Sequence, residues 1–225
     1  MSNLTKRQQA LVDLCKNAKT TCDVGCDHGF VGVNLLQTKK TDFLYATDIS
    51  LLSANKAKVL LEKHNLNSKA SVRVGDGLST LSDDEIIEQV IIAGMGAPLI
   101  MQIIDNYQNK KFVKHWVFQP MNELEDFRKY LSRNNFKILR DVVIYDKQKF
   151  YHIIAAKNGK QKISENEQKF GKIEKDKDEV YFRWLEEKNR KLQKILANLP
   201  KNNEKTEQIL QCLEDIKKIT TKQRR

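Results

Sequence analysis

Short apolar runs alternate with helix-like stretches along the first 156 residues, and this alternation limits the fold more than any other feature. Of the first five runs, all except the third are followed by a segment of helical character, and the third is closed by Gly75-Asp76-Gly77. The seven runs span residues 20–24, 43–48, 70–74, 89–93, 116–119, 136–145 and 150–156. Strands that alternate with helices predict an α/β domain with a mainly parallel sheet.

The last two runs follow a different pattern. Only a short polar segment separates 136–145 from 150–156, so we expect two antiparallel strands joined by a turn. A plain dinucleotide-binding sheet does not need such a hairpin, whereas a class I methyltransferase sheet ends with one. The prediction is therefore a Rossmann-like, seven-stranded sheet of the class I methyltransferase type, closed by an antiparallel hairpin.

The C-terminal part differs in charge and in texture. Residues 1–156 carry 21 Lys and Arg against 17 Asp and Glu, whereas residues 157–225 carry 19 against 12. We predict two antiparallel helices forming a coiled-coil hairpin, with a domain boundary between residues 158 and 159. The alternative is a partly disordered, charged tail. The apolar seam comprises Tyr181, Leu185, Leu192, Ile195 and Leu199, and then Ile209, Leu213, Ile216 and Thr220.

Composition narrows the class of partner. The chain has a formal charge of +11 and a pI near 9.4, which favours a polyanionic partner. No apolar run approaches the roughly 18–20 residues that a membrane span needs. The four cysteines include no Cys-x-x-Cys pair, so a zinc site is not expected. We expect a cytoplasmic protein that binds no membrane and no metal.

The segment after the first strand carries the first site signal. Gly25 allows a tight turn at the point where ligands of open α/β sheets bind. Asp27 and His28 stand where a Gly-x-Gly-x-x-Gly loop has small residues, and a carboxylate there would repel a pyrophosphate. It suits a cofactor with a cationic amino-acid end, such as S-adenosylmethionine. The alternative for Asp27 is a helix N-cap.

Three further strand ends carry acidic residues or glycines. Asp48 ends the second strand, where a carboxylate accepts bonds from ribose hydroxyls, or else caps the next helix. Asp76, between two glycines, is an acceptor for an adenine amino group, or else forms a local turn. The fourth strand ends at 93–96 with exposed backbone and Met95, which can pack on an aromatic ring.

Four segments, in the right order, resemble the TrmK family of bacterial tRNA (adenine-22-N1)-methyltransferases. Residues 23–30 (DVGCDHGF) resemble the family's D-I-G-S-D-H-A-Y motif, and 72–78 (VRVGDGL) its R-x-G-D-G-L. Residues 91–100 (IIAGMGAPLI) resemble I-A-G-M-G-G-x-L-I, and 118–120 (FQP) the start of L-Q-P-N. The chain departs from the family at Cys26, Met121 and His152, which stand where the family has Ser, Asn and Glu.

The resemblance implies methylation of adenine N1 in the D-arm region of tRNA, with S-adenosylmethionine as cofactor. It makes residues 1–158 the cofactor-binding catalytic domain and 159–225 a tRNA-binding domain, and we expect a monomer. The competing hypotheses are a related RNA or protein methyltransferase, an inactive RNA-binding relative and a nicotinamide oxidoreductase. The cofactor-binding residues would be Asp23, Gly25, Asp27, His28, Asp48, Ile49, Asp76, Gly77, Ala93, Gly94 and Met95.

Methyl transfer from a sulfonium mainly requires that the two partners are positioned and that water is excluded. Neutral adenine presents a lone pair at N1, so no strong base is needed before attack. The candidate catalytic residues are Asp27, His28, Gln119 and Asn122, any of which would take or orient the amino proton that the product loses. Because N1 lies on the Watson–Crick edge, the base must be unpaired or flipped out.

Overall fold

The computed structural model describes residues 4–171, 179–199 and 204–222. The chain divides into two compact units, Met1–Lys172 and Ile173–Arg225. This division lies beyond the boundary expected at 158/159, because a short helix, α6 (Glu165–Phe170), belongs to the first unit. It is held there by Arg128, whose Nη1 donates a hydrogen bond to the carbonyl of Gln168 at 3.1 Å.

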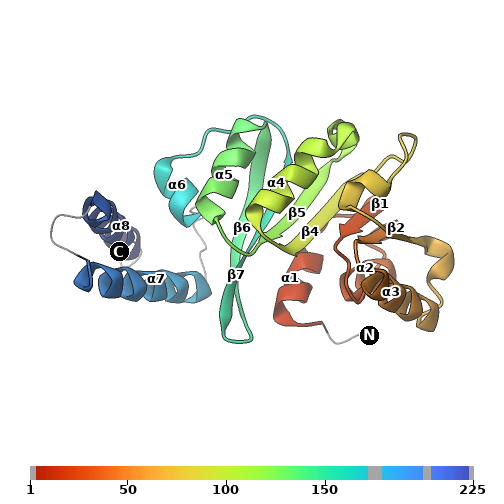
Figure 1. Cartoon of the computed structure of the whole chain (residues 1–225), viewed down its shortest axis with the longest axis horizontal. Coiled ribbons are helices and arrows are strands. Elements are labelled where there is room, and N and C mark those ends of the chain that lie inside the picture. Colours follow the sequence, from red (N-terminus) through yellow and green to blue (C-terminus); the bar gives the residue numbers. More distant parts are fainter. Residues whose placement is uncertain (1–3, 172–178, 200–203, 223–225) are drawn as a thin grey trace. The chain divides into compact units, whose positions relative to one another are not determined.

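The first unit is built on one seven-stranded sheet, which confirms the predicted fold (Figure 1). The strand order is β3-β2-β1-β4-β5-β7-β6, and β7 runs antiparallel to the other six strands. The strands are β1 (Ala18–Val24), β2 (Thr41–Asp48), β3 (Ala70–Val74), β4 (Gln89–Met95), β5 (His115–Pro120), β6 (Phe136–Asp146) and β7 (Lys149–Asn158).

The predicted helices also form, with small differences at their ends. Ser50 caps the helix that ends at Lys63, and its hydroxyl accepts a hydrogen bond from the Ser53 amide at 3.3 Å. None of the helices in the described ranges is long and apolar enough to span a bilayer. The other helices are α1 (Lys6–Leu14), α2 (Phe30–Gln37), α3 (Leu51–Lys63), α4 (Ala97–Asn106), α5 (Leu124–Arg133), α7 (Glu179–Ala197) and α8 (Glu204–Lys222).

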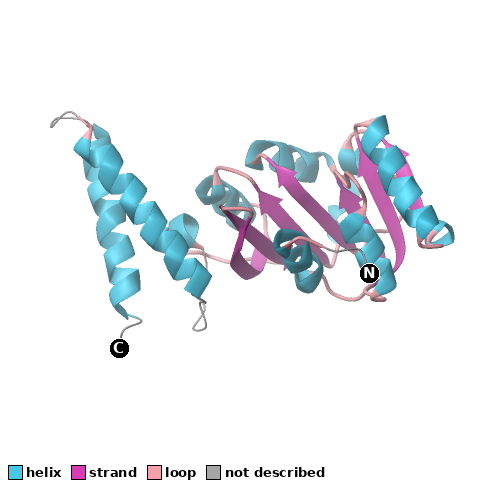
Figure 2. Cartoon of the chain, turned by 90° about the horizontal axis from the view of Figure 1, so that it is seen from below, coloured by secondary structure: helices cyan, strands magenta, loops and turns pink. Residues whose placement is uncertain are grey.

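Helices cover both faces of the sheet (Figure 2). Successive residues of a strand point to opposite faces, and β4 illustrates the result. Ile91 packs with α1 and α2 on one face, whereas Ile92 packs with α4 and α5 on the other. Both side chains are fully buried. Apolar residues on consecutive positions of β4 are therefore explained by burial on two sides.

The register of the parallel strands brings the predicted site segments to one edge of the sheet. Val24 lies opposite Thr47 on one side and Ile92 on the other. Asp48 lies opposite Val74 on the outer strand β3. The segments that follow these positions therefore emerge side by side at the carboxyl ends of β1 to β4. This is the edge where open α/β sheets bind ligands.

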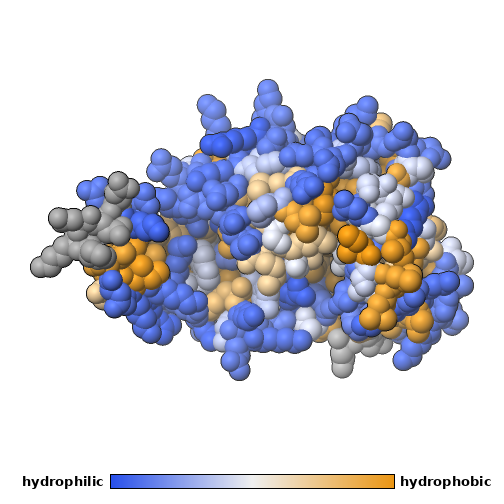
Figure 3. All heavy atoms as spheres, in the orientation of Figure 1, coloured by the Kyte–Doolittle hydropathy of each residue, from blue (hydrophilic) through white to orange (hydrophobic). Residues whose placement is uncertain are grey.

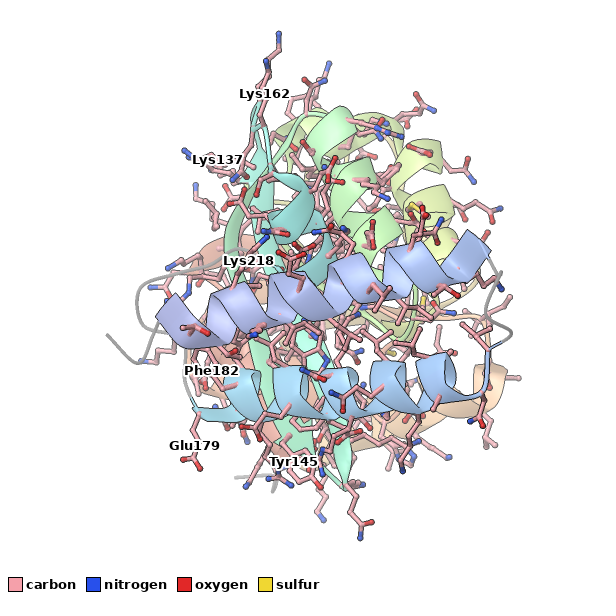
Figure 4. All side chains as sticks on the ribbon, turned by 90° about the vertical axis from the view of Figure 1, so that its left-hand side faces the viewer. Lys137, Tyr145, Lys162, Glu179, Phe182 and Lys218 are labelled. Atoms are coloured by element: carbon pink, nitrogen blue, oxygen red, sulfur yellow. The ribbon has the colours of Figure 1, made fainter. Side chains whose placement is uncertain are left out.

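The second unit consists of α7 and α8, which run side by side and antiparallel (Figures 2 and 4). Tyr181, Leu185 and Ile216 are buried, as the apolar seam predicts. Ile195 departs from the seam, with half of its surface exposed. A helix of 3.6 residues per turn drifts away from a strict heptad seam, which explains why a residue late in α7 leaves the contact. The sequence also predicts a break between the two helices at residues 200–203, beginning with Pro200, and this segment lies outside the described residues.

A buried ion pair joins α5 to the closing hairpin. The Arg128 Nε donates to Oδ2 of Asp141 at 2.7 Å, and the Arg128 Nη2 lies 3.0 Å from Nδ1 of His152. Both partners of the ion pair are almost completely enclosed. Burial opposes ionisation of Asp141, but the charge of Arg128 and bonds from His152 and Arg128 outweigh it, so the pKa of Asp141 lies well below its usual range.

We predict that Arg128→Met lowers the free energy of unfolding by about 3–5 kcal/mol at pH 7, because it leaves a buried carboxylate without its cation. Lys129→Met on the same helix removes partly exposed ion pairs with Glu125 and Asp126 and is expected to lower it by less than about 0.5 kcal/mol. Urea denaturation measures both. Equal losses of stability in the two variants would contradict the prediction.

The same pair predicts a pH dependence. Because the folded-state pKa of Asp141 is lowered, its stabilising contribution is present at neutral pH and is lost as the pH falls below about 3.9, the ordinary value for a carboxyl. The difference in stability between the unaltered protein and Arg128→Met should therefore shrink in acid. A difference that stays constant between pH 7 and pH 3 would rule this out.

Candidate cofactor site at the carboxyl edge of the sheet

A cavity of about 430 Å³ opens where β1 to β4 end. Its volume lies in the range of small-molecule sites. Five residues that the sequence did not predict for the site also contribute to its wall: Arg7, Val24, Gly75, Leu99 and Ile103. The predicted cofactor-binding residues that line it are Gly25, Asp27, Asp48, Ile49, Asp76, Gly77, Ala93, Gly94 and Met95.

The loop after β1 is shaped by Gly25. Its φ of 71° lies in the left-handed region, and a Cβ there would collide with the methyl group of Met95. The amides of Gly25 and Cys26 both donate to the carbonyl of Thr47, at 2.8 and 3.0 Å, which fixes the loop to β2. The N-cap of α2 is Gly29, without a side-chain bond. The alternative role of Asp27 as the N-cap is therefore wrong, and its exposed carboxylate lines the cavity.

Asp48 joins two segments of the cavity wall. Its Oδ2 accepts a hydrogen bond from the Asp27 amide at 3.0 Å, and its Oδ1 accepts one from the Ser50 amide at 2.9 Å. These bonds fix the orientation of the carboxylate, since a carboxylate has about four acceptor positions and uses two here. The remaining positions are available to a ligand hydroxyl. Ser50, not Asp48, supplies the N-cap of α3.

Asp23 lies behind the cavity rather than in its wall. It is buried in β1, and burial raises its pKa to about 7, with the charge of Asp48 adding to the effect and a hydrogen bond from the Gly32 backbone opposing it. A carboxyl that is half-protonated near neutral pH limits the negative charge that accumulates beneath the loop. Asp23 is therefore absent from the cavity wall, and its role in cofactor binding stays a prediction.

The end of β3 contributes Asp76. Its side chain is exposed, lines the cavity and makes no capping hydrogen bond to the short 3-10 turn that follows. The Asp76 carbonyl closes that turn by accepting from the amide and the hydroxyl of Ser79, at 3.0 and 2.6 Å. The carboxylate of Asp76 therefore takes no part in the turn.

Arg7 enters the same cavity from α1. Its Nη1 donates to Oε1 of Gln119 at 2.7 Å, and its guanidinium lies 5.4 Å from the ring centre of Tyr151. A Cβ on Gly94 would lie 3.5 Å from that Nη1, so the guanidinium stands beside the β4 end. No carboxylate among the described residues forms an ion pair with it. In the sequence, Lys6 and Arg7 are indistinguishable from a solvated basic pair.

The remaining predicted catalytic residues occupy different places. Gln119 is fully buried and is held by Arg7, while its Nε2 donates to the Pro120 carbonyl at 3.1 Å. Asn122 is exposed, and its Oδ1 accepts from the Ala97 amide at 3.0 Å, so it caps α4. His28 lies outside the cavity wall, with Nε2 at 3.7 Å from Oδ1 of Asp27.

The charges of the cavity are distributed unequally. Three carboxylates, from Asp27, Asp48 and Asp76, line the half formed by β1, β2 and β3, and Arg7 stands at the half formed by β4 and β5. This arrangement fits a ligand with a cation, several hydroxyl or amino donors and one anion. Within the described ranges, no group of three His, Cys, Asp or Glu residues is placed to hold a metal ion.

Comparison with known proteins agrees with this chemistry. The family model described as TrmK, tRNA (adenine(22)-N(1))-methyltransferase, matches residues 21–221. The tRNA (adenine(22)-N(1))-methyltransferase of Bacillus subtilis is 29% identical over 157 residues, which are 69% of this chain. The matched stretch spans 66% of the length of that relative.

Solved structures extend the likeness over nearly the whole chain. TrmK from M. capricolum, in complex with the cofactor product S-adenosyl-homocysteine, is 26% identical with a TM-score of 0.86, and the match covers 96% of this chain and 97% of that one. A protein of the NADB-Rossmann superfamily from Streptococcus agalactiae is 29% identical with a TM-score of 0.87, over the same shares of the two chains. The chain belongs to the TrmK family of tRNA (adenine(22)-N(1))-methyltransferases.

Proposed function

We propose that this protein transfers a methyl group from S-adenosylmethionine to N1 of adenine 22 in tRNA. The observation that carries the proposal is a cavity whose wall combines three acidic residues, Asp27, Asp48 and Asp76, with Arg7. Membership in the TrmK family supports the same reaction, and so does the M. capricolum relative with its bound cofactor product.

The donor set fits each part of the cofactor. Asp48, already fixed by two amides, is the acceptor for the ribose hydroxyls, and Asp76 is the acceptor for the adenine amino group. Asp27 is the partner for the ammonium group. Arg7 is the partner for the carboxylate, because a guanidinium binds a carboxylate through two parallel hydrogen bonds. Met95 contributes an apolar contact beside the turn at Gly25.

The cofactor supplies a methyl group on a positively charged sulfur, which a nitrogen lone pair attacks. The main task of the protein is therefore to position the methyl donor and the base. The end of β4, at 93–95, offers no ionisable side chain to the cavity, and Asn122 is already bonded to the first amide of α4. Asp27 is an exposed carboxylate in the cavity wall and is proposed to accept the amino proton that the methylated base releases.

The reaction itself is tested on unmodified tRNA transcripts with radiolabelled S-adenosylmethionine. We expect one methyl group per tRNA, mapped to N1 of adenine 22 by a reverse-transcription stop, and none in a transcript with guanine at that position. Methylation of ribosomal RNA or of a protein instead would favour a related methyltransferase. Cofactor binding without transfer to any RNA would favour an inactive RNA-binding relative.

We propose that α7 and α8 contact tRNA phosphates and take no part in the chemistry. Arg190, Lys194 and Lys217 are exposed and form no ion pair within the described residues, whereas Lys191 and Lys218 are paired with acids on their own helices. Phosphate contacts position a protein on RNA without reading its sequence.

A tRNA substrate favours a cytoplasmic location. That the protein is a monomer stays a prediction, which analytical ultracentrifugation tests.

The first prediction concerns Asp48. We expect Asp48→Ala to weaken S-adenosyl-homocysteine binding by about 10- to 150-fold, since a hydrogen bond to a charged group contributes roughly 1.5–3 kcal/mol. Asp42→Ala, at the exposed start of the same strand and therefore at its opposite end, should leave affinity unchanged. Calorimetric titration measures both, and an unaltered affinity of Asp48→Ala would show that this carboxylate serves only the loop.

The second prediction concerns Arg7. Arg7→Met should weaken binding of S-adenosyl-homocysteine by about tenfold or more, because a charge-assisted bond is removed. It should leave binding of methylthioadenosine, which lacks the amino-acid part, within about a factor of two. Arg7→Lys should recover part of the affinity, and Lys6→Met serves as the neighbouring control. If both ligands are weakened equally, Arg7 does not recognise the carboxylate.

The third prediction concerns the second unit. The triple variant Arg190→Gln, Lys194→Gln, Lys217→Gln should bind tRNA more weakly, with a salt slope that is shallower by about 0.7–0.9 for each phosphate that is no longer neutralised. Its affinity for S-adenosyl-homocysteine should match that of the unaltered protein. Glu186→Gln on α7 is the control and should not weaken tRNA binding. An unchanged slope in the triple variant would refute the proposed role.

A further inference from the structure

A second hollow, of about 440 Å³, lies beside the cofactor cavity, between the first turn of α2 and the outer side of α3. We call it the α2–α3 groove. None of its residues lines the cofactor cavity. Figure 3 shows exposed apolar side chains over the region of α3. The groove is lined by His28, Phe30, Leu52, Asn55, Lys56, Val59, Leu60 and Lys63.

The shape of the groove follows from the sequence of α3. The lining positions of α3 recur every three or four residues from 52 to 63 and so form one stripe on the helix. The opposite side of α3 is buried, at Ala54, Ala57 and Leu61. Gly29 lies so close to Ala57 that a Cβ on Gly29 would approach it to 2.9 Å. This close packing sets the start of α2 directly against α3 and leaves Phe30 beside the stripe.

The groove presents flat, apolar surface to water. The rings of His28 and Phe30 are nearly parallel, 13° apart in orientation, with centres separated by 5.7 Å. Leu52 and Val59 are 67% and 62% exposed. A single exposed leucine needs no explanation, but an apolar stripe next to two stacked rings is the surface on which an aromatic ligand packs.

Positive charge flanks this surface. Lys56 and Lys63 lie on the groove, and neither forms an ion pair with any described residue. The amide of Asn55 adds a hydrogen-bond donor and acceptor at the same place. A ligand that complements the groove therefore combines an aromatic plane with an anion. A nucleotide has this combination, since its base stacks while its phosphate meets cations.

The groove is adjacent to the site of chemistry. Asp27 lines the cofactor cavity and its Oδ1 lies 3.7 Å from Nε2 of His28, which lines the groove. One residue pair thus separates the two hollows. A nucleotide held in the groove would be a neighbour of the base that reaches the cofactor.

We propose that the α2–α3 groove binds an unpaired nucleotide of the RNA substrate, other than the methylated adenine. Its base stacks on Phe30 and His28 above the apolar stripe, and its phosphate contacts Lys56 and Lys63. This proposal rests on the proposed function for the identity of the RNA. It adds a second base-binding site, of the stacking kind by which proteins recognise unpaired RNA.

Matched variants of the 225-residue protein test the contributions of the Lys56 charge and of the Phe30 ring. Lys56→Glu lies in the groove, whereas Lys58→Glu makes the same change at an exposed position of the same helix outside it. Phe30→Leu keeps an apolar side chain and removes the flat face. We expect Lys56→Glu and Phe30→Leu to weaken tRNA binding by about five- to tenfold or more, in fluorescence anisotropy, as removal of a stacked base does. Lys58→Glu should change it by less than about twofold, and all three should bind S-adenosyl-homocysteine normally.

A double-mutant cycle, with one change in the protein and one in the tRNA, tests whether a base stacks on Phe30. Unpaired nucleotides near adenine 22 are replaced singly by abasic residues in the tRNA. At one position, removal of the base should weaken binding to the unaltered protein about fivefold or more and binding to Phe30→Leu by less than about twofold. No such position, or equal effects of Lys56→Glu and Lys58→Glu, would overturn the proposal. So would a change in sedimentation mass of Phe30→Leu with unchanged tRNA affinity, which would assign the groove to a second copy of the chain.

The experiments distinguish a failure of the groove proposal from a failure of the proposed function. If the unaltered protein methylates adenine 22 but the groove variants bind tRNA normally, only the groove proposal fails. If the unaltered protein binds no tRNA, both fail together. If the variants bind tRNA more weakly as expected while the methyl group maps elsewhere, the groove stands and the target assignment falls.

Discussion

The register of the parallel strands is the constraint on which the site depends. The turns after β1, β2, β3 and β4 come from segments about 70 residues apart at their extremes, and hydrogen bonding between the strands ends them at one edge. A shift of one residue in any pair would turn each side chain to the opposite face. At this edge the amides of Gly25 and Cys26 both donate to the Thr47 carbonyl, which fixes the register of β1 against β2.

The binding properties of the cavity depend on where its charged side chains lie, not only on how many there are. Asp48 uses its carboxylate both to hold the loop at Asp27 and to face the cavity, so the loop and the binding group form together. Asp23 lies behind them with a raised pKa, which moderates the repulsion between neighbouring acids. Arg7 supplies the opposing charge from α1. Its bond to Gln119 links that helix to β5 and fixes the guanidinium beside the end of β4.

RNA recognition, as proposed, is divided among separate surfaces. The second unit offers cations without ion-pair partners in the described part of the chain, at Arg190, Lys194 and Lys217, which suit a backbone without reading bases. The α2–α3 groove offers an aromatic and apolar surface with two lysines, which suits one unpaired nucleotide. Contacts of the first kind supply affinity that falls with salt, while stacking supplies a contact that is much less sensitive to it.

The sequence by itself determined the sheet, its closing hairpin, the helical pair and most of the cavity wall. These depend on local patterns: apolar runs, the spacing of helical faces, and acids or glycines at strand ends. Only the tertiary structure decided the partner of Arg7, the capping role of Asn122 and the groove in which His28 lies. Those features join residues far apart in the chain, and no local pattern distinguishes Arg7 from Lys6. The first unit likewise extends to Lys172, beyond the change in composition after residue 156. The hydrogen bond from Arg128 to the Gln168 carbonyl holds this additional segment on the first unit, because packing, not charge, sets where a domain ends.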